Sequence, residues 1–181
     1  MKRLVLLSGL VMASLSFAGE LKGVKMPDEV TVEGKALKLN GMGLRVKFIV
    51  NVYVAGLYVE NKSTDPATIL KNDEARRVDM KMLRDLDAKT IVDAIRTGFE
   101  KNSGSQMGAL KERLDKFCAL IPALKEGQTL TLTYVPGKGT SVVGAGEATF
   151  ITGKDFSDAL MSVWIGKSPV DDGLKKGMLG Q

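Results

Sequence analysis

The segment "NGMGLRVKFIVNVYVAGLYVE", Asn40 to Glu60, decides the fold because it carries the longest strand signal in the sequence. Its β-branched and aromatic residues are typical of a buried sheet, yet it contains an arginine. Every second residue of a straight strand shares a face, so one face of this segment would be apolar and the other would carry hydrogen-bond donors. The donors are Arg45, Lys47, Asn51 and Tyr53.

A ligand site shared by Arg45 and Tyr53 requires the chain to bend. At about 3.3 Å per residue, the two residues would lie roughly 26 Å apart on a straight strand. Asn51 is the only turn-prone residue between them, which is a weak signal for a reversal or bulge between Phe48 and Asn51. Two interpretations of Arg45 stay open. It is a surface charge at a strand end, or it lies at the mouth of an apolar cavity and binds an anion.

The composition indicates one globular domain that is exported. The chain has 181 residues, of which 44% are hydrophobic and 26% charged, which is typical of a folded protein. Residues 1–18 combine a basic start, an apolar stretch and a small-x-small ending, the pattern of a cleavable signal peptide. We therefore expect a mature domain of residues 19–181, beginning at Gly19, in a bacterial periplasm and without stable membrane insertion.

The charge pattern gives no sign of a nucleic-acid partner. The formal net charge is +5, and removal of Lys2 and Arg3 with the signal peptide would lower it by two. Basic pairs such as Arg76-Arg77 have acidic neighbours. We interpret these pairs as solvated surface rather than as a nucleic-acid patch.

The absence of histidine from the sequence excludes several classes of site. Ser-His-Asp and Cys-His catalysis and His-containing zinc sites all need this residue. The single cysteine, Cys118, falls on the apolar stripe of a predicted helix and is interpreted as core. The glycines of "PGKGTSVVGAGEATF" match no phosphate-binding fingerprint. We expect neither a cofactor nor a metal.

Hydrophobic periodicity predicts an α+β fold. Strands are predicted at residues 30–32, 36–39, 76–83 and 128–135, and around 141–143 and 147–151. Five helices are predicted. A short one begins after an Asp65 cap, two cover 88–102 and 106–121, the fourth begins at a Thr152–Asp155 capping box, and the last covers 169–178. Helices clustered between runs of strands favour a mainly antiparallel sheet that is covered by helices on one face.

Two stretches resemble a known family. "GMGLRVKFIVNVYVAGLYVE" resembles the signature strands of the chalcone isomerase fold, and "FSDALMSVWIGKSPVDDGLKKGMLG" is similar to the C-terminal helices of its bacterial branch. The resemblance covers about Val30 to Gly180. It implies an open-faced β-sandwich, in which a curved antiparallel sheet and a layer of helices enclose a ligand cleft.

The resemblance also implies site residues. The family contains plant enzymes that close a chalcone to a flavanone, and relatives that bind fatty acids or have no known catalysis. Both groups use an arginine at the position matched by Arg45, to steady an enolate in the enzymes and to hold a carboxylate in the fatty-acid binders. The binders add a tyrosine on the next strand, which is matched best by Tyr53, with Tyr58 as the second choice.

This sequence departs from the catalytic pattern of that family. The enzymes carry a threonine where Tyr53 stands, and a tyrosine, a lysine and an asparagine around the start of the following helix. Here "RDLDAKTIVDAIRTGF" contains no tyrosine and no asparagine. Near the expected positions stand Lys89, Thr90 and Arg96, and Ser162 matches a Ser or Thr of the penultimate helix only approximately.

The favoured hypothesis is a monomeric, non-catalytic protein that binds a fatty acid or another small apolar anion through Arg45. The alternative is an intramolecular lyase of the chalcone isomerase type, in which Arg45 stabilises an enolate. A structural or partner-binding module with a vestigial cleft is the third hypothesis.

Overall fold

The computed structural model describes residues 17–143 and 149–181. Residues 1–16 of the predicted signal peptide therefore lie outside the described part, as do Gly144, Gly146 and Glu147. The strands are β1 (Phe17–Leu21), β2 (Val24–Pro27), β3 (Glu29–Val32), β4 (Lys35–Lys47), β5 (Val50–Val59), β6 (Arg76–Met82), β7 (Thr129–Val135), β8 (Gly139–Val143) and β9 (Phe150–Ile151). The helices are α1 (Pro66–Lys71), α2 (Ala88–Ser103), α3 (Met107–Ala119), α4 (Lys154–Ile165) and α5 (Asp172–Met178), with a 3-10 turn, η1 (Gly104–Gln106), before α3.

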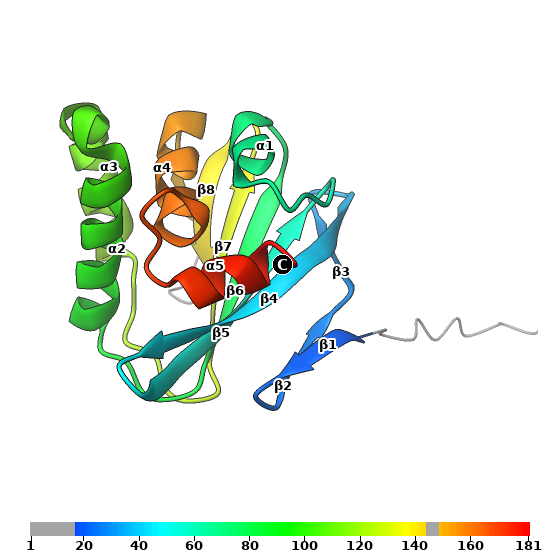
Figure 1. Ribbon diagram of the computed structural model, residues 1–181. Helices are drawn as coiled ribbons and strands as arrows, with labels where there is room; N and C mark the ends of the chain where they lie inside the picture. The colour runs from blue at the N-terminus through cyan, green and yellow to red at the C-terminus, as the bar shows by residue number, and fades with distance from the viewer. Residues whose placement is uncertain (1–16, 144–148) are drawn as a thin grey trace, which may run out of the picture.

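Strands β3 to β9 form one seven-stranded sheet in chain order, and every neighbouring pair is antiparallel. The helices gather on one side of this curved sheet, with α2 and α3 at one end and α5 across β4 (Figure 1). The sheet does not close on itself. The predicted α+β open-faced sandwich is confirmed.

Alternation along the strands divides the apolar residues between two clusters. In β5, Ala55 and Leu57 belong to the main core under the helices, whereas Val54 and Tyr58 belong to a smaller cluster. Successive strand residues point to opposite faces, so the second cluster lies on the other side of the sheet. There it packs against Met26 of the β1–β2 ribbon, an element that the periodicity did not predict.

Two helix starts differ from the sequence prediction. The last helix begins at Asp172 with Asp171 as its cap, after Pro169 rather than at it. Helix α4 follows Gly153, which has a φ of 103° and makes no side-chain cap. Asp155, expected to form a capping box with Thr152, is instead bound by the Arg113 guanidinium. The predicted Asp65 cap is confirmed, since its carboxylate accepts from the amides of Ala67 and Thr68.

The interpretation of Arg76 as solvated surface was wrong. Arg76 is only 2% exposed, because strand alternation turns its side chain toward the helices, on the same face as Val78. Its Nη2 donates to Ser157 Oγ at 2.8 Å and forms an ion pair with Asp158. Only Arg77, the other member of the pair, stays partly exposed and is paired with an aspartate of its own strand.

Candidate ligand-binding cavity

A tight hairpin brings Arg45 opposite Tyr53. Strand β4 ends at Lys47 and β5 begins at Val50, so the chain reverses at Phe48 and Ile49. Arg45 and Tyr53 are direct partners in the β4–β5 register. The register shifts by one residue immediately beyond this pair, which marks a bulge. The predicted bend is confirmed, and it removes the separation that a straight strand would impose.

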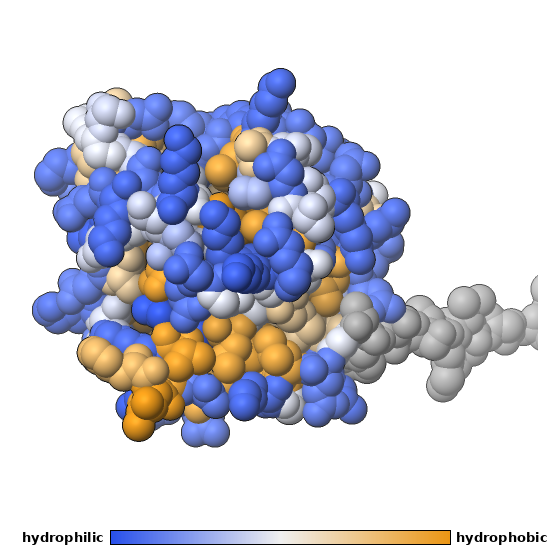
Figure 2. Space-filling view, viewed as in Figure 1, coloured by the Kyte–Doolittle hydropathy of each residue, from blue (hydrophilic) through white to orange (hydrophobic). Residues whose placement is uncertain are grey.

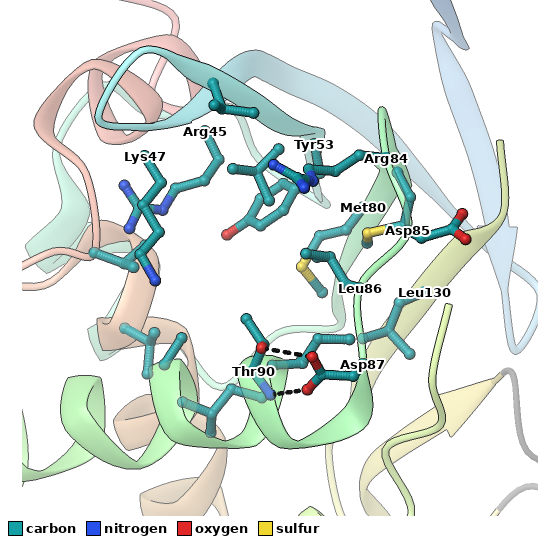
Figure 3. A pocket seen from close by; sticks show the side chains of 18 of the residues that line it. Arg45, Lys47, Tyr53, Met80, Arg84, Asp85, Leu86, Asp87, Thr90 and Leu130 are labelled. Carbon is teal, nitrogen blue, oxygen red and sulfur yellow. Dashed lines mark hydrogen bonds between the residues drawn. The ribbon is translucent and has the colours of Figure 1, made fainter. Parts of the chain in front are cut away.

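Beneath this pair lies a cavity of about 330 Å³, within the range of small-molecule sites. It is enclosed by the β4–β5 hairpin above, α2 below and β6 on one side (Figure 3). Most of the wall is apolar. The apolar lining comprises Phe48, Val50, Val52, Met80, Met82, Leu86, Ile91, Ala94, Ile95, Leu130, Val163, Trp164 and Val170.

Arg45 lines this cavity with a guanidinium that is only partly engaged. Its side chain is 18% exposed, and its Nη1 donates to the Val46 carbonyl at 2.7 Å and to Asp171 Oδ2 at 3.2 Å. Nε and Nη2 make no hydrogen bond to any residue that the structure describes. A guanidinium binds a carboxylate best through two parallel N–H groups, and such a pair is still available here.

Asp171 is held in place by backbone contacts from two elements. As the cap of α5 it accepts from the Leu174 amide at 2.8 Å, and it also accepts from the Val46 amide at 3.2 Å. Burial alone would raise the pKa of Asp171, but these two amides and the Arg45 guanidinium together hold that pKa below its usual value. Asp171 is therefore ionised at neutral pH and occupies one side of the Arg45 guanidinium.

Close glycine contacts fix the position of α5 across β4. A Cβ on Gly43 would lie 2.2 Å from the Leu174 carbonyl oxygen, and one on Gly41 would lie 2.2 Å from that of Gly177. Neither approach allows a larger residue, because the obstructing atoms are backbone. The two stretches that resemble the chalcone isomerase family therefore pack against each other, and this contact brings Asp171 to Arg45.

Tyr53 presents a neutral hydroxyl to the cavity. Its oxygen accepts a hydrogen bond from Trp164 Nε1 at 3.1 Å, and the hydroxyl points into the open space beneath the hairpin (Figure 3). Burial raises the pKa of Tyr53 to about 12, and the Trp164 bond and the nearby Arg45 offset this only in part. The phenol keeps its proton at neutral pH, so it can donate that proton to an anion beside Arg45.

The other charged groups at the cavity are unequally compensated. Lys47 and Arg84 line it and form no ion pair within the described residues. Asp85 is already bound to Lys125 Nζ at 2.8 Å, and Asp87 caps α2 by accepting from the Thr90 amide and hydroxyl. Among the described residues, two unpaired cations, Lys47 and Arg84, thus stand against one unpaired carboxylate, Asp87, so the net charge of the unpaired groups at the cavity is positive.

The structure does not bring Tyr58 to this cavity. Tyr58 is fully buried in the small cluster on the other face of the sheet, and its hydroxyl donates to the Pro27 carbonyl at 3.2 Å. It stands an odd number of residues from Tyr53, so strand alternation turns it away from Arg45. Tyr58 is thus removed from the candidate set, which keeps Arg45 and Tyr53.

The positions that the catalytic pattern singles out are mostly turned away. Lys89 is 84% exposed and pairs with Asp93, and Arg96 pairs with Asp115 on the helix surface. The Ser162 hydroxyl donates to the Asp158 carbonyl within its own helix. Of these positions only Thr90 lines the cavity.

Two features of the cavity were missed from the sequence. Trp164 belongs to the apolar core under the helices, but its indole N–H also orients Tyr53. A lone tryptophan on a stripe opposite a buried tyrosine is the signal that could have suggested this. The sequence prediction begins the last helix at Pro169 and so does not identify Asp171, although aspartate is a preferred helix-capping residue.

Other site types find little support in the residues that the structure describes. No group of three or more potential metal-binding side chains occurs in that part of the chain. No helix in it has the length and apolar character needed to cross a membrane. Cys118 is buried as expected, and burial raises the pKa of its thiol.

Comparisons with known proteins agree with this architecture. The crystal structure of a fatty-acid binding protein of Arabidopsis thaliana superposes with a TM-score of 0.71 at 18% sequence identity, over 91% of this chain and 96% of that protein. This likeness establishes the fold. No curated protein is significantly similar in sequence. The family model described as chalcone isomerase-like matches residues 18–180, so the chain belongs to the chalcone isomerase-like family.

Proposed function

We propose that this protein binds a fatty acid or a similar apolar carboxylate, with the tail in the cavity and the carboxylate at Arg45. The observation that carries the proposal is the position of the Arg45 guanidinium. It lines an apolar cavity and keeps Nε and Nη2 free of other described residues. The structural likeness to a plant fatty-acid binding protein supports the same class of ligand.

The head group and the tail have different roles in this proposal. Burial of the tail contributes about 0.8 kcal/mol per CH₂ before the costs of ordering the ligand are subtracted. The carboxylate sets the register by accepting from Arg45, and the neutral Tyr53 hydroxyl donates from the facing strand. Both donors stand next to the apolar wall, where water competes less for their hydrogen bonds, and each bond to the carboxylate is therefore stronger.

Binding of dodecanoate and dodecanol to the purified protein tests this assignment. Loss of a charge-assisted, partly buried contact costs about 1.5 to 3 kcal/mol, so Arg45→Ala should weaken dodecanoate binding by roughly tenfold to a hundredfold. Dodecanol, which has the same chain and no charge, should hardly respond. Arg77→Ala is the matched control, because it removes the same charge from the other face of the sheet. Equal dodecanoate affinity of Arg45→Ala and the wild type would exclude the assignment.

A direct search for the natural ligand complements this assay. Organic extraction of the purified protein, followed by mass spectrometry, should release an apolar acid in a stoichiometric amount. Arg45→Ala protein prepared in the same way should carry less of it. An extract free of apolar acids, together with no measurable dodecanoate binding, would contradict the proposal that the cavity binds an apolar carboxylate.

We also propose that the protein acts in the periplasm after cleavage before Gly19. Such cleavage would keep the β1–β2 pairs Gly19↔Met26, Glu20↔Lys25 and Leu21↔Val24 and remove only Phe17↔Pro27. The mature chain would therefore retain most of the ribbon. The intact mass of protein from the periplasmic fraction decides this proposal, and a mass that includes Met1 to Ala18 would contradict it.

We do not expect chalcone isomerase activity, although Arg45 could stabilise an enolate. Efficient ring closure also requires the substrate to be positioned by further groups. Lys89 and Arg96 stand near the positions where the enzymes carry such groups, and here both pair with carboxylates away from the cavity. Rapid conversion of a chalcone to a flavanone, abolished by Arg45→Ala, would establish the enzymatic alternative instead.

A further inference from the structure

The tip of the β4–β5 hairpin, residues Lys47 to Val50, exposes apolar side chains that the fold does not use. Phe48 is 92% exposed and Ile49 is 94% exposed, and Val50 is the third large apolar residue of the tip on the surface. Phe48 has a φ of 57°, a left-handed conformation that is uncommon for a bulky residue. Glycine or asparagine would form this turn with less strain. The apolar residues at the tip therefore need an explanation other than folding.

The tip is continuous with a larger apolar surface. Figure 2 shows hydrophobic side chains extending from the hairpin end, at the lower left, across the lower part of this face. Patches of this kind on a soluble domain mark contact with another molecule.

The charge around the tip is positive. Within Arg45 to Val50 there are two basic residues and no acidic one. Lys47 in the tip and Arg84 beside it are exposed and make no ion pair in the part of the chain that the structure describes. Two exposed acids follow Arg84: Asp85 is paired with Lys125, and Asp87 caps α2. The surface thus combines exposed apolar side chains with flanking cations.

We propose that the hairpin tip docks reversibly on an anionic lipid bilayer, with Phe48 and Ile49 in the interfacial region and Lys47 and Arg84 at the lipid head groups. Apolar side chains partition into this region, and each basic residue near an anionic surface adds attraction. The hairpin is short and carries no spanning segment, so the association is peripheral.

A second copy of the chain fits the tip less well than a lipid surface. Two tips in contact would bring Lys47 and Arg84 of one copy toward the same cations of the other, and like charges repel. An anionic bilayer satisfies both the apolar side chains and the cations.

The cavity opens beside this tip. Phe48 and Val50 line the cavity and are exposed at the tip as well. An apolar ligand tail could therefore pass between the bilayer and the cavity along these side chains. Docking itself does not depend on the proposed carboxylate site, because the tip and its cations are present in the ligand-free chain.

Co-sedimentation with phospholipid vesicles tests the proposal. The protein is purified from the soluble fraction and mixed with vesicles that either contain anionic phospholipid or consist only of zwitterionic phospholipid, because each basic residue near an anionic surface adds about 1 kcal/mol of attraction. We expect binding to the anionic vesicles that weakens on removal of the anionic lipid and with added salt. All variants are prepared with the same N-terminus, so differences in vesicle binding between them come from the substituted residues.

Two variants and one control define the expected result. Phe48→Asn combined with Ile49→Ser should lower vesicle binding at least tenfold, and asparagine suits the left-handed turn, so the fold should persist. Lys47→Glu should lower it by roughly fivefold to thirtyfold. The control combines Val143→Ser with Phe150→Ser, two exposed apolar positions on β8 and β9. These strands lie at the opposite edge of the sheet from β3 and β4, so the control should bind like the wild type.

Three outcomes would overturn the proposal. The wild type could fail to bind anionic vesicles, or the tip variant could bind as well as the wild type. The wild type could also dimerise in light scattering without vesicles, with the tip variant monomeric and vesicle binding absent, which would assign the tip to a second copy. Dodecanoate binding in vesicle-free solution is measured separately, so a failure of docking is distinguishable from a failure of the carboxylate site.

Discussion

Arg45 and Asp171 form an ion pair at the wall of the cavity, with Arg45 Nη1 lying 3.2 Å from Asp171 Oδ2. The two residues come from opposite ends of the chain and meet because α5 crosses β4 at its glycines. The carboxylate of Asp171 thus already binds the group that we assign to the ligand. A ligand carboxylate must share the guanidinium with Asp171, and the two negative charges repel each other.

The first prediction follows from this competition. Asp171→Asn removes the competing negative charge and its repulsion of the ligand carboxylate, so dodecanoate should bind several-fold more tightly. An asparagine can still cap α5 through its side-chain oxygen. Asp172→Asn, one residue further on, is a matched control because its side chain does not contact Arg45. Weaker dodecanoate binding by Asp171→Asn would mean that Asp171 orients Arg45 rather than competing for it.

A second prediction concerns acid stability. The pKa of Asp171 is lower in the folded protein than the ordinary value of about 3.9, so its ionised form stabilises the fold at neutral pH. This contribution is fully present above the unfolded pKa and is lost as the pH falls through the lower folded pKa. The stability advantage of the wild type over Asp171→Asn should therefore shrink below about pH 4. Thermal unfolding of both proteins across this range measures it, and a pH-independent difference would contradict it.

The third prediction separates the two tyrosines. Tyr53→Phe should weaken dodecanoate binding by roughly twofold to tenfold, because one neutral hydrogen bond is worth about 0.5 to 1.5 kcal/mol. It should also lower stability slightly, since Trp164 Nε1 loses its acceptor. Tyr58→Phe is the control on the opposite face and should leave the affinity unchanged. If Tyr58→Phe alone reduced dodecanoate binding, the placement of the head group beside Tyr53 would be wrong.

Strand alternation alone predicts which face of the sheet each candidate residue occupies. Arg45 and Tyr53 were placed on one face of the segment, and that relationship survives although the segment is a hairpin and not one strand. The same rule would have removed Tyr58, which stands five positions beyond Tyr53. It would also have buried Arg76, which alternates in phase with Val78 and Met80. For both residues strand alternation is a better guide to position than residue type or family resemblance.

Other features could not be read from local patterns. The turn at Phe48 and Ile49 contains neither glycine nor proline, so the only signal for the reversal that pairs Arg45 with Tyr53 is the weak one from Asn51. The partnership of Arg45 with Asp171 spans 126 positions, and no periodicity connects them. Such contacts depend on how α5 lies across the sheet, which is a property of the packed tertiary structure.

The last prediction tests the crossing that positions Asp171. Gly43→Ala places a Cβ against the Leu174 backbone, where no side-chain rearrangement can relieve the overlap, so α5 must shift. We expect a loss of about 1 to 3 kcal/mol in the free energy of unfolding, measured with urea. Gly108→Ala is the control, because a Cβ there meets nothing within 4 Å, and alanine is favoured over glycine in a helix by roughly 0.5 to 1 kcal/mol. It should leave the stability equal or higher. If Gly43→Ala were as stable as Gly108→Ala, the close contact between α5 and β4 would not be what holds Asp171 at Arg45.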